Sequence, residues 1–432
     1  MAEGAGMKWE RAGLVGAAIG VVAAGAAAGV AIERATVGRG TRRRAQLALD
    51  AAGPYGSLRG APGSAVAEDG TELYYETDEA DEAEPASEPA SEQAGPSREA
   101  GSVRPARRGW LRGRRADTGA GAGAGAGPDQ DAQDPPEPLT VVFSHGYCLN
   151  QDSWHFQRAL LRGAVRAVYW DQRSHGRSER GRDQLAGEPA TIDQLGRDLK
   201  AVLDAAAPRG PVVLVGHSMG GMTVMAFADQ YPEYVRERVA GVALVSTSSG
   251  KLAADTLGLP AAGARAFRAI APGLLRVMGR QAELVERGRR ATAELFAGVI
   301  KRYSFGSDDV DPAVARFAER LIEATPIDVV AEFYPAFTAH EKVGALAVLD
   351  GRPALVLAGG KDLLMPSAHS AEIAARLPDA ELLVVPGAGH LVLFERPEVV
   401  GPALAALVAK AADGVRAPVP RRLRELTAAA DA

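Results

Sequence analysis

The chain is poor in the residues that build metal and redox centres. Cys148 is its only cysteine, and a lone cysteine can form neither an internal disulfide nor a cysteine-rich metal centre. The seven histidines are scattered, and no two of them lie at metal-ligand spacing. Neither a His-Glu-x-x-His motif nor a phosphate-binding G-x-x-x-x-G-K-[ST] motif occurs. The sequence therefore predicts no metal site and no cofactor.

An excess of positive charge is also missing. Lys and Arg total 49 against 54 Asp and Glu, for a net charge of −5, which gives no general reason to expect nucleic acid as a partner. Hydrophobic residues make up 47% and charged residues 24%, as in ordinary globular proteins, so a wholly disordered chain is excluded. Composition leaves the oligomeric state open.

The amino-terminal region contains the longest apolar run. Residues 13–32 carry no charge and are long enough to cross a bilayer as one helix. A cleaved signal peptide and a soluble alanine-rich helix are the alternatives. A basic flank follows, formed by Arg34, Arg39, Arg42, Arg43 and Arg44. By the positive-inside rule, region 1–45 predicts a single-pass membrane protein with the part of the chain that follows the helix in the cytoplasm, although an extracytoplasmic orientation stays open.

The next hundred residues hold little regular pattern. Residues 46–62 are typical of a linker, and residues 63–78 alternate around an Asp69-Gly70 turn, which predicts a hairpin. Residues 79–137 are acidic, then arginine-rich, then a Gly-Ala repeat, and this composition predicts a disordered insertion.

Regular structure is expected again from residue 138. Apolar runs suited to buried strands lie at 140–146, 164–171, 211–218, 239–247, 353–360 and 380–387. Helical patterns between them, such as 192–207 and 397–412, predict a mostly parallel α/β sheet with helices on both faces. Residues 250–340 interrupt the alternation with helical pattern and predict an inserted cap. The core would then comprise 138–249 and 341–413, followed by a tail at 414–432.

The most specific chemical signal is the sequence Gly216-His217-Ser218-Met219-Gly220, between a strand run and a helical run. A serine at a tight strand-to-helix turn has crowded neighbours, so small residues are required at Gly216 and Gly220. The helix amino terminus directs positive partial charge at the hydroxyl. We expect Ser218 to be a nucleophile.

A serine nucleophile needs a base and a carboxylate that orients the base. His390 follows the last strand run in a glycine-rich loop, and Asp362 follows the preceding strand run. The loop after residues 239–245 offers no rival carboxylate. Ser218, Asp362 and His390 are therefore the candidate catalytic residues.

The remaining requirement is an oxyanion hole, meaning two backbone N–H groups directed at the developing negative oxygen. Met219 follows the nucleophile and supplies the first candidate. Tyr147 supplies the second, because it follows His145-Gly146 in the loop after the strand run at 140–146. His145 and Gly146 would support this loop.

The segments VVFSHGYCLNQDSW, YWDQRSHGRS, VLVGHSMGG, LAGGKD and PGAGHLVLFERPE together resemble the motifs of lidded α/β-hydrolase-fold enzymes. The resemblance covers about residues 138–413, and the hairpin is similar to that fold's first two strands. It implies a Ser–Asp–His hydrolase with a helical cap after the sixth strand. It also implies a structural role for a loop containing Asp171, Arg173 and His175. The long insertion and the amino-terminal apolar segment depart from the pattern.

These observations predict a serine hydrolase that cleaves an apolar carboxylic ester or thioester, with a small-molecule ester or acyl compound as substrate. An aminopeptidase, a carbon–carbon bond hydrolase and a haloperoxidase-like esterase of the same fold share the pattern and stay open. The alternative of another class is a membrane-tethered receptor that keeps the pocket without catalysis.

Overall fold

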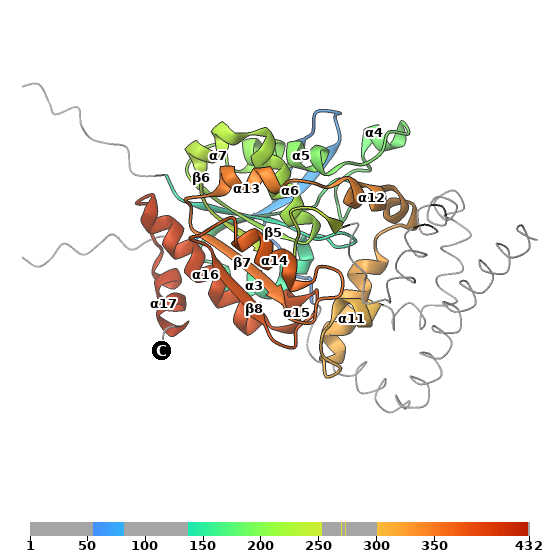
Figure 1. Cartoon of the computed structure of the whole chain (residues 1–432). Coiled ribbons are helices and arrows are strands. Elements are labelled where there is room, and N and C mark those ends of the chain that lie inside the picture. Colours follow the sequence, from blue (N-terminus) through green and yellow to red (C-terminus); the bar gives the residue numbers. More distant parts are fainter. Residues whose placement is uncertain (1–54, 82–136, 253–268, 270–272, 274–299, 431–432) are drawn as a thin grey trace, which may run out of the picture. The chain divides into compact units, whose positions relative to one another are not determined.

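The computed structural model describes residues 55–81, 137–252, 269, 273 and 300–430 (Figure 1). These residues contain one eight-stranded sheet in the order β1-β2-β4-β3-β5-β6-β7-β8. The strands are β1 Ala61–Val66, β2 Glu72–Asp78, β3 Thr140–Ser144, β4 Arg166–Trp170, β5 Val212–His217, β6 Val239–Val245, β7 Ala354–Gly359 and β8 Glu381–Val385. β1 and β2 pair antiparallel, β2 joins β4 antiparallel, and all later pairs are parallel.

Helices cover both faces of the sheet. They are α3 His155–Leu161, α4 Arg182–Leu185, α5 Ile192–Ala206, α6 Met219–Gln230, α7 Pro232–Arg238, α11 Pro312–Glu323, α12 Ile327–Ala339, α13 Leu346–Leu349, α14 Ser367–Ala374, α15 Val392–Glu395, α16 Pro397–Gly414 and α17 Arg421–Ala430, with short 3-10 helices η1 Gln151–Trp154 and η3 Val343–Ala345. Successive residues of β3 point to opposite faces, so Val141 packs with α16 whereas Val142 packs with α5. Figure 1 shows α5, α6 and α7 on one side of the sheet and α16 on the other. The predicted fold class is confirmed.

The central strands are buried along their whole length. Every residue of β3, β5, β6 and β7 is buried, as expected for parallel strands covered on two faces. Helix α5 begins after Thr191, whose hydroxyl accepts a hydrogen bond from the Gln194 N–H at 3.1 Å. Because β3, β5, β7 and β8 run parallel to one another, their carboxyl ends lie at the same edge of the sheet. The predicted site residues follow the strands at this edge.

Several segments differ in detail from the prediction. The hairpin starts at Ala61 and not at residue 63. Its first strand, β1, is an edge strand with mostly exposed residues and little apolar alternation, so the sequence did not mark its start. The region expected to be a tail contains α17, and Leu423 from this helix is buried in the core. Within the predicted cap, α11 and α12 are described. The predicted disordered insertion lies outside the described residues, apart from 79–81 and 137.

The structure contradicts the predicted single-pass membrane localisation. Residues 13–32 and their basic flank lie outside the described residues. Within the residues that are described, no helix combines the length and the apolar character needed to cross a bilayer. The prediction of membrane attachment, and of the cytoplasmic placement that depended on it, is therefore wrong.

Candidate active site

Ser218 occupies a sharp turn between β5 and α6. Its φ of 53° lies in the left-handed region, which is strained for a residue with a side chain. A Cβ atom on Gly216 would lie 2.4 Å from the Gly220 carbonyl oxygen, and one on Gly220 would lie 2.1 Å from the Ser144 carbonyl oxygen. Only glycine fits at these two positions, so the backbone contacts of the turn explain the spacing of the motif.

A chain of hydrogen bonds connects the three predicted catalytic residues. The His390 Nε2 atom lies 3.0 Å from the Ser218 hydroxyl oxygen, and His390 Nδ1 lies 2.8 Å from Asp362 Oδ2. The second oxygen of Asp362 accepts the backbone N–H groups of Leu364 at 2.9 Å and Met365 at 2.8 Å. The carboxylate is thus fixed by its own loop, and all three side chains are buried.

The two predicted oxyanion donors come from different elements. Met219 is the first residue of α6, and its N–H has no intrahelical acceptor because it belongs to the first helical turn. Tyr147 follows β3 and stands beside the tightly packed Gly146, whose hypothetical Cβ would lie 2.7 Å from His217 Nδ1. Among the described residues, neither N–H donates to a backbone carbonyl outside the regular elements.

The Tyr147 side chain connects the loop that follows β3 to helix α12. Its hydroxyl donates to the backbone carbonyl of Val330, and its ring meets Phe337 edge-on at a centroid distance of 4.9 Å. Burial raises the pKa of this hydroxyl well above 10.0, so it stays protonated and can donate. Helix α12 is further held by Arg180, which lies 2.5 Å from Glu332.

His145 contacts the loop that follows β3 and the segment that follows β4. Its Nδ1 atom lies 2.7 Å from the Gly146 carbonyl, and its Nε2 atom accepts the Gln172 N–H at 2.9 Å. A nitrogen that accepts carries no proton, so the ring is neutral with the proton on Nδ1. Burial, reinforced by the neighbouring His175, lowers the pKa of His145 to about 3. Gln172 itself was not predicted from the sequence.

The loop implied by the family resemblance is held by buried ionic and hydrogen-bonded contacts. The Asp171 carboxylate accepts the N–H groups of Gln151 at 2.7 Å and Arg177 at 2.8 Å. Burial raises the pKa of Asp171 to about 6. Arg173 binds Asp198 through two hydrogen bonds of 2.6 Å. None of the hydrogen bonds described for Asp171 and Arg173 involves Ser218 or His390.

Two residues near Ser218, Asp362 and His390 were missed by sequence reasoning. The His217 ring lies beside the His390 ring at a centroid distance of 5.0 Å. The Glu395 carboxylate accepts backbone N–H groups from Gly389 at 2.7 Å and from Ser307 at 2.8 Å. Glu395 therefore joins the loop of His390 to the segment that leads into α11. The sequence offered two signals for these residues: His217 lies in the motif around Ser218, and Glu395 lies in the segment PGAGHLVLFERPE.

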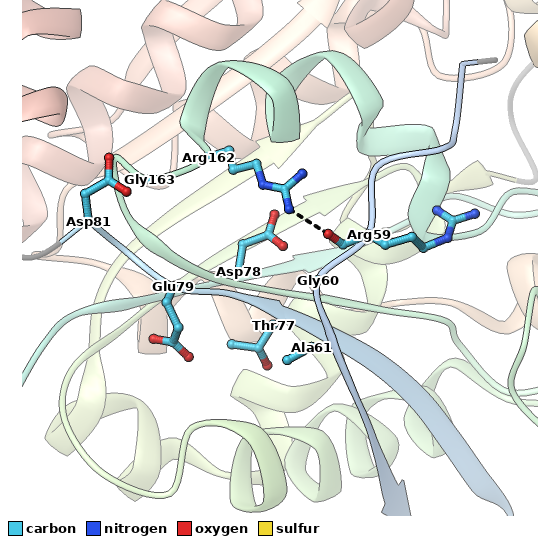
Figure 2. Close-up of a pocket in the computed structure, with 9 residues that line it drawn as sticks. All are labelled: Arg59, Gly60, Ala61, Thr77, Asp78, Glu79, Asp81, Arg162 and Gly163. Carbon is cyan, nitrogen blue, oxygen red and sulfur yellow. Dashed lines mark hydrogen bonds between the residues drawn. The ribbon is translucent and has the colours of Figure 1, made fainter. Parts of the chain in front are cut away.

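A polar pocket of about 340 Å³ lies away from these residues, around the junction of β1, β2 and α3. Figure 2 shows Arg59 and Arg162 in its wall, together with the acidic residues Asp78, Glu79 and Asp81. No predicted site residue lines it. Within the described part of the chain, no group of three or more His, Cys, Asp or Glu residues is arranged to hold a metal ion.

Comparison with known proteins identifies related sequences. Residues 140–397 match the family described as alpha/beta hydrolase fold. The chain is 27% identical over 274 residues to the dihydrolipoyllysine-residue acetyltransferase component of an acetoin cleaving system from Pseudomonas putida, and the match covers 63% of this chain and 64% of that protein. It is 29% identical over 265 residues to a monoacylglycerol lipase from Mycolicibacterium smegmatis, covering 60% of this chain and 82% of the lipase.

A solved structure supports the same fold. A thermophilic esterase from Thermogutta terrifontis superimposes with a TM-score of 0.53 at 21% identity, covering 81% of this chain and 98% of the esterase. At this identity the likeness concerns the arrangement of the strands and helices.

Proposed function

The chain belongs to the α/β-hydrolase fold family of enzymes, and from this membership we propose that it is a serine hydrolase that cleaves a carboxylic ester or thioester. The observation that carries the proposal is the unbroken hydrogen-bond chain from Ser218 through His390 to Asp362. Relatives that include a lipase support the bond type. The substrate is a small molecule with an acyl group.

In the first half of the reaction, the Ser218 oxygen attacks the carbonyl carbon of the substrate. His390 Nε2, at 3.0 Å, takes the hydroxyl proton as the new C–O bond forms. Asp362 keeps the opposite ring nitrogen protonated and stabilises the positive ring. The N–H groups of Tyr147 and Met219 stabilise the oxyanion. His390 then gives its proton to the leaving alcohol or thiol, and an acyl-enzyme is left on Ser218.

The second half repeats these steps with water. His390 takes one proton from water, the hydroxide oxygen attacks the acyl carbon, and the tetrahedral intermediate collapses. The proton returns to the Ser218 oxygen as the C–O bond to the enzyme breaks. The products are a carboxylic acid and the unchanged serine, so each turnover consumes one water molecule and needs no redox partner.

The surroundings of the proposed oxyanion hole favour an apolar acyl group. Met219 belongs to a buried apolar cluster that also contains Met222 and Phe333. Tyr147, Phe337 and Met365 pack against this cluster and are only partly buried. An acyl chain in contact with these side chains would gain roughly 0.8 kcal/mol for each CH₂ group removed from water.

The test is labelling by a fluorophosphonate probe, which reacts readily only with an activated serine. We expect the probe to label the unaltered protein and not the Ser218→Ala variant. Ser248→Ala is the matched control. Ser248 is another buried serine within hydrogen-bond distance of a histidine, but its hydroxyl donates to the Gly250 carbonyl. Labelling that survives Ser218→Ala would refute the assignment.

Esters of graded acyl length then define the substrate class. We expect turnover to rise with chain length until the apolar contacts are filled. No turnover of any ester by a protein that the probe still labels would favour the peptidase or carbon–carbon bond hydrolase alternatives. No labelling and no turnover would favour a binding protein that uses the fold without catalysis.

A further inference from the structure

His217 stands directly before Ser218 in the chain and is completely enclosed. Its Nε2 atom lies 3.0 Å from the backbone carbonyl oxygen of His390, a residue 173 positions away in the sequence. A carbonyl oxygen can only accept, so His217 Nε2 carries the proton and donates it. One side chain thus connects the strand that ends at the nucleophile with the loop that carries the proposed base.

The peptide group after His390 is held at both ends. Its carbonyl accepts from His217, and its N–H, which belongs to Leu391, donates to the Ser304 carbonyl at 2.8 Å. The preceding N–H, on Gly389, donates to Glu395. Of these three anchors, His217 alone is covalently adjacent to Ser218, so its hydrogen bond directly fixes the nucleophile strand relative to His390.

The other side of the His217 ring approaches the oxyanion loop. Its Nδ1 atom has no hydrogen-bond partner among the described residues, and it lies where a Cβ on Gly146 would be only 2.7 Å away. Burial, with the neighbouring His390 as a second cause, lowers the pKa of His217 well below 6.5, so the ring stays neutral. A neutral ring does not repel the positive charge that His390 acquires during the reaction.

We propose that His217 is a positioning residue, which sets the distance between Ser218 and His390 by donating from Nε2 to the His390 backbone carbonyl. This inference rests on the proposed function, because it assigns His390 the role of base. His217 itself touches neither the substrate nor the reacting atoms. Its effect is on the rate of the chemical step and not on binding.

The structure provides a closely matched control in His340. This histidine is also buried, its Nε2 atom also lies 2.9 Å from a backbone carbonyl, that of Ser248, and its Nδ1 also lacks a partner among the described residues. The two histidines differ in the carbonyl that each contacts, which belongs to His390 for His217 and to Ser248 for His340. Replacing either ring removes one buried hydrogen bond, but only the His217 replacement releases the loop of His390.

The experiment compares His217→Leu and His217→Gln with His340→Leu and His340→Gln in the full chain. Leucine removes the donor, whereas glutamine places an amide N–H near the position of Nε2. For each variant the folded fraction, the rate of fluorophosphonate labelling, kcat and KM are measured. We expect His217→Leu to lower the labelling rate and kcat by about tenfold to a hundredfold, with KM changed less than about twofold.

His217→Gln should recover most of the labelling rate and kcat. His340→Leu should keep the rates of the unaltered protein while losing as much stability as His217→Leu. Equal rates in the two leucine variants, or no recovery with glutamine, would overturn the inference and leave the proposed function intact. If His217→Leu does not fold, His217→Asn replaces it, since its shorter amide cannot reach the carbonyl. Failure of the unaltered protein to react with the probe would remove the proposed function, and this inference with it.

Discussion

Both the Ser218 site and the ion-pair cluster between β2 and α3 bury ionisable groups, but the two regions differ in where their hydrogen bonds are directed. Along β2 and α3, Arg158 donates to both oxygens of Asp78 at 2.8 Å and lies 2.8 Å from Glu76. Its hydrogen bonds are directed inward, to partners of the same cluster. At Ser218, by contrast, we propose that the backbone N–H groups of Tyr147 and Met219 are left to bind a substrate oxygen, since neither donates to a backbone carbonyl outside the regular elements among the described residues.

Under the proposed function, this difference separates a structural cluster from a reactive one. A buried ion pair whose partners are mutually satisfied keeps the fold in register, and removing one partner leaves an uncompensated charge. A reactive site instead keeps hydrogen-bonding capacity that its own residues do not use. We therefore expect changes at Ser218, His390 and Asp362 to affect rate and not stability, and changes at Arg158 to do the reverse.

The largest effect is expected from Asp362→Asn. Asparagine keeps the size of the side chain but can donate to His390 Nδ1, which favours the wrong ring tautomer. We expect kcat to fall by roughly a thousandfold or more, while the thermal unfolding midpoint changes little. Steady-state kinetics and calorimetry on the same sample measure both quantities. Near-normal activity would mean that another carboxylate orients the base.

Arg158→Met should show the opposite pattern. Removing the guanidinium leaves Asp78 buried without its charged partner and takes the shortest ion pair from Glu76, which costs about 3–5 kcal/mol in the free energy of unfolding. Activity per folded molecule should stay close to normal. The control is Arg59→Ala, because Arg59 pairs with Asp152 at 2.8 Å but its side chain is 44% exposed. That variant should lose at most about 1 kcal/mol.

Acidification tests the buried histidines beside the site. Burial lowers the pKa of His145 to about 3 and that of His175 to about 4, against 6.5 as the ordinary value. The unfolded chain therefore binds these protons first as the pH falls, so the stabilisation is complete above pH 6.5 and is lost below it. Each histidine should contribute a loss of about 2 kcal/mol between pH 7 and pH 5.

Asp171 has the opposite effect on the free energy of unfolding as the pH falls. Burial raises the pKa of its carboxyl from 3.8 to about 6, so the folded protein binds a proton there before the unfolded chain does. This binding recovers about 1 kcal/mol as the pH falls to 5. Urea unfolding at the two pH values should still show a net loss of stability. His175→Asn, which removes one titrating group, should make the decline shallower by about 2 kcal/mol, and an unchanged slope would contradict the assignment.

The smallest effect is expected from Tyr147→Phe. Phenylalanine loses the hydrogen bond to the Val330 carbonyl of α12 but keeps the backbone N–H that we propose as an oxyanion donor. The free energy of unfolding should fall by about 1 kcal/mol, and the labelling rate should stay within about threefold. A hundredfold slower labelling would show that the side chain, and not the main chain, acts on the oxyanion.

The sequence predicted the central strands well because burial on both faces leaves a continuous apolar run. The expected runs at 211–218 and 353–360 correspond to β5 and β7 within one residue at each end. The start of β1 at Ala61 was missed, since an exposed edge strand places no constraint on apolar alternation. The membrane prediction failed because it rested on the composition of one segment alone.

Within the site, the sequence indicated residues that sit in short, spaced motifs. It did not indicate His217, Gln172 or Glu395 as partners, because each acts through hydrogen bonds to backbone groups of another segment. A backbone acceptor is present at every residue, so no residue type marks it. Such contacts can be found only once the chain is folded.

The close approach of Gly220 to the Ser144 carbonyl has a consequence for engineering. The helix that begins at Met219 and the strand that leads to Tyr147 touch through main-chain atoms, with no side chain between them. The distance between the two proposed N–H donors is therefore set by the packing of main-chain atoms. Replacing the Tyr147 side chain therefore leaves this contact in place, whereas a single methyl group at position 220 would force the two elements apart.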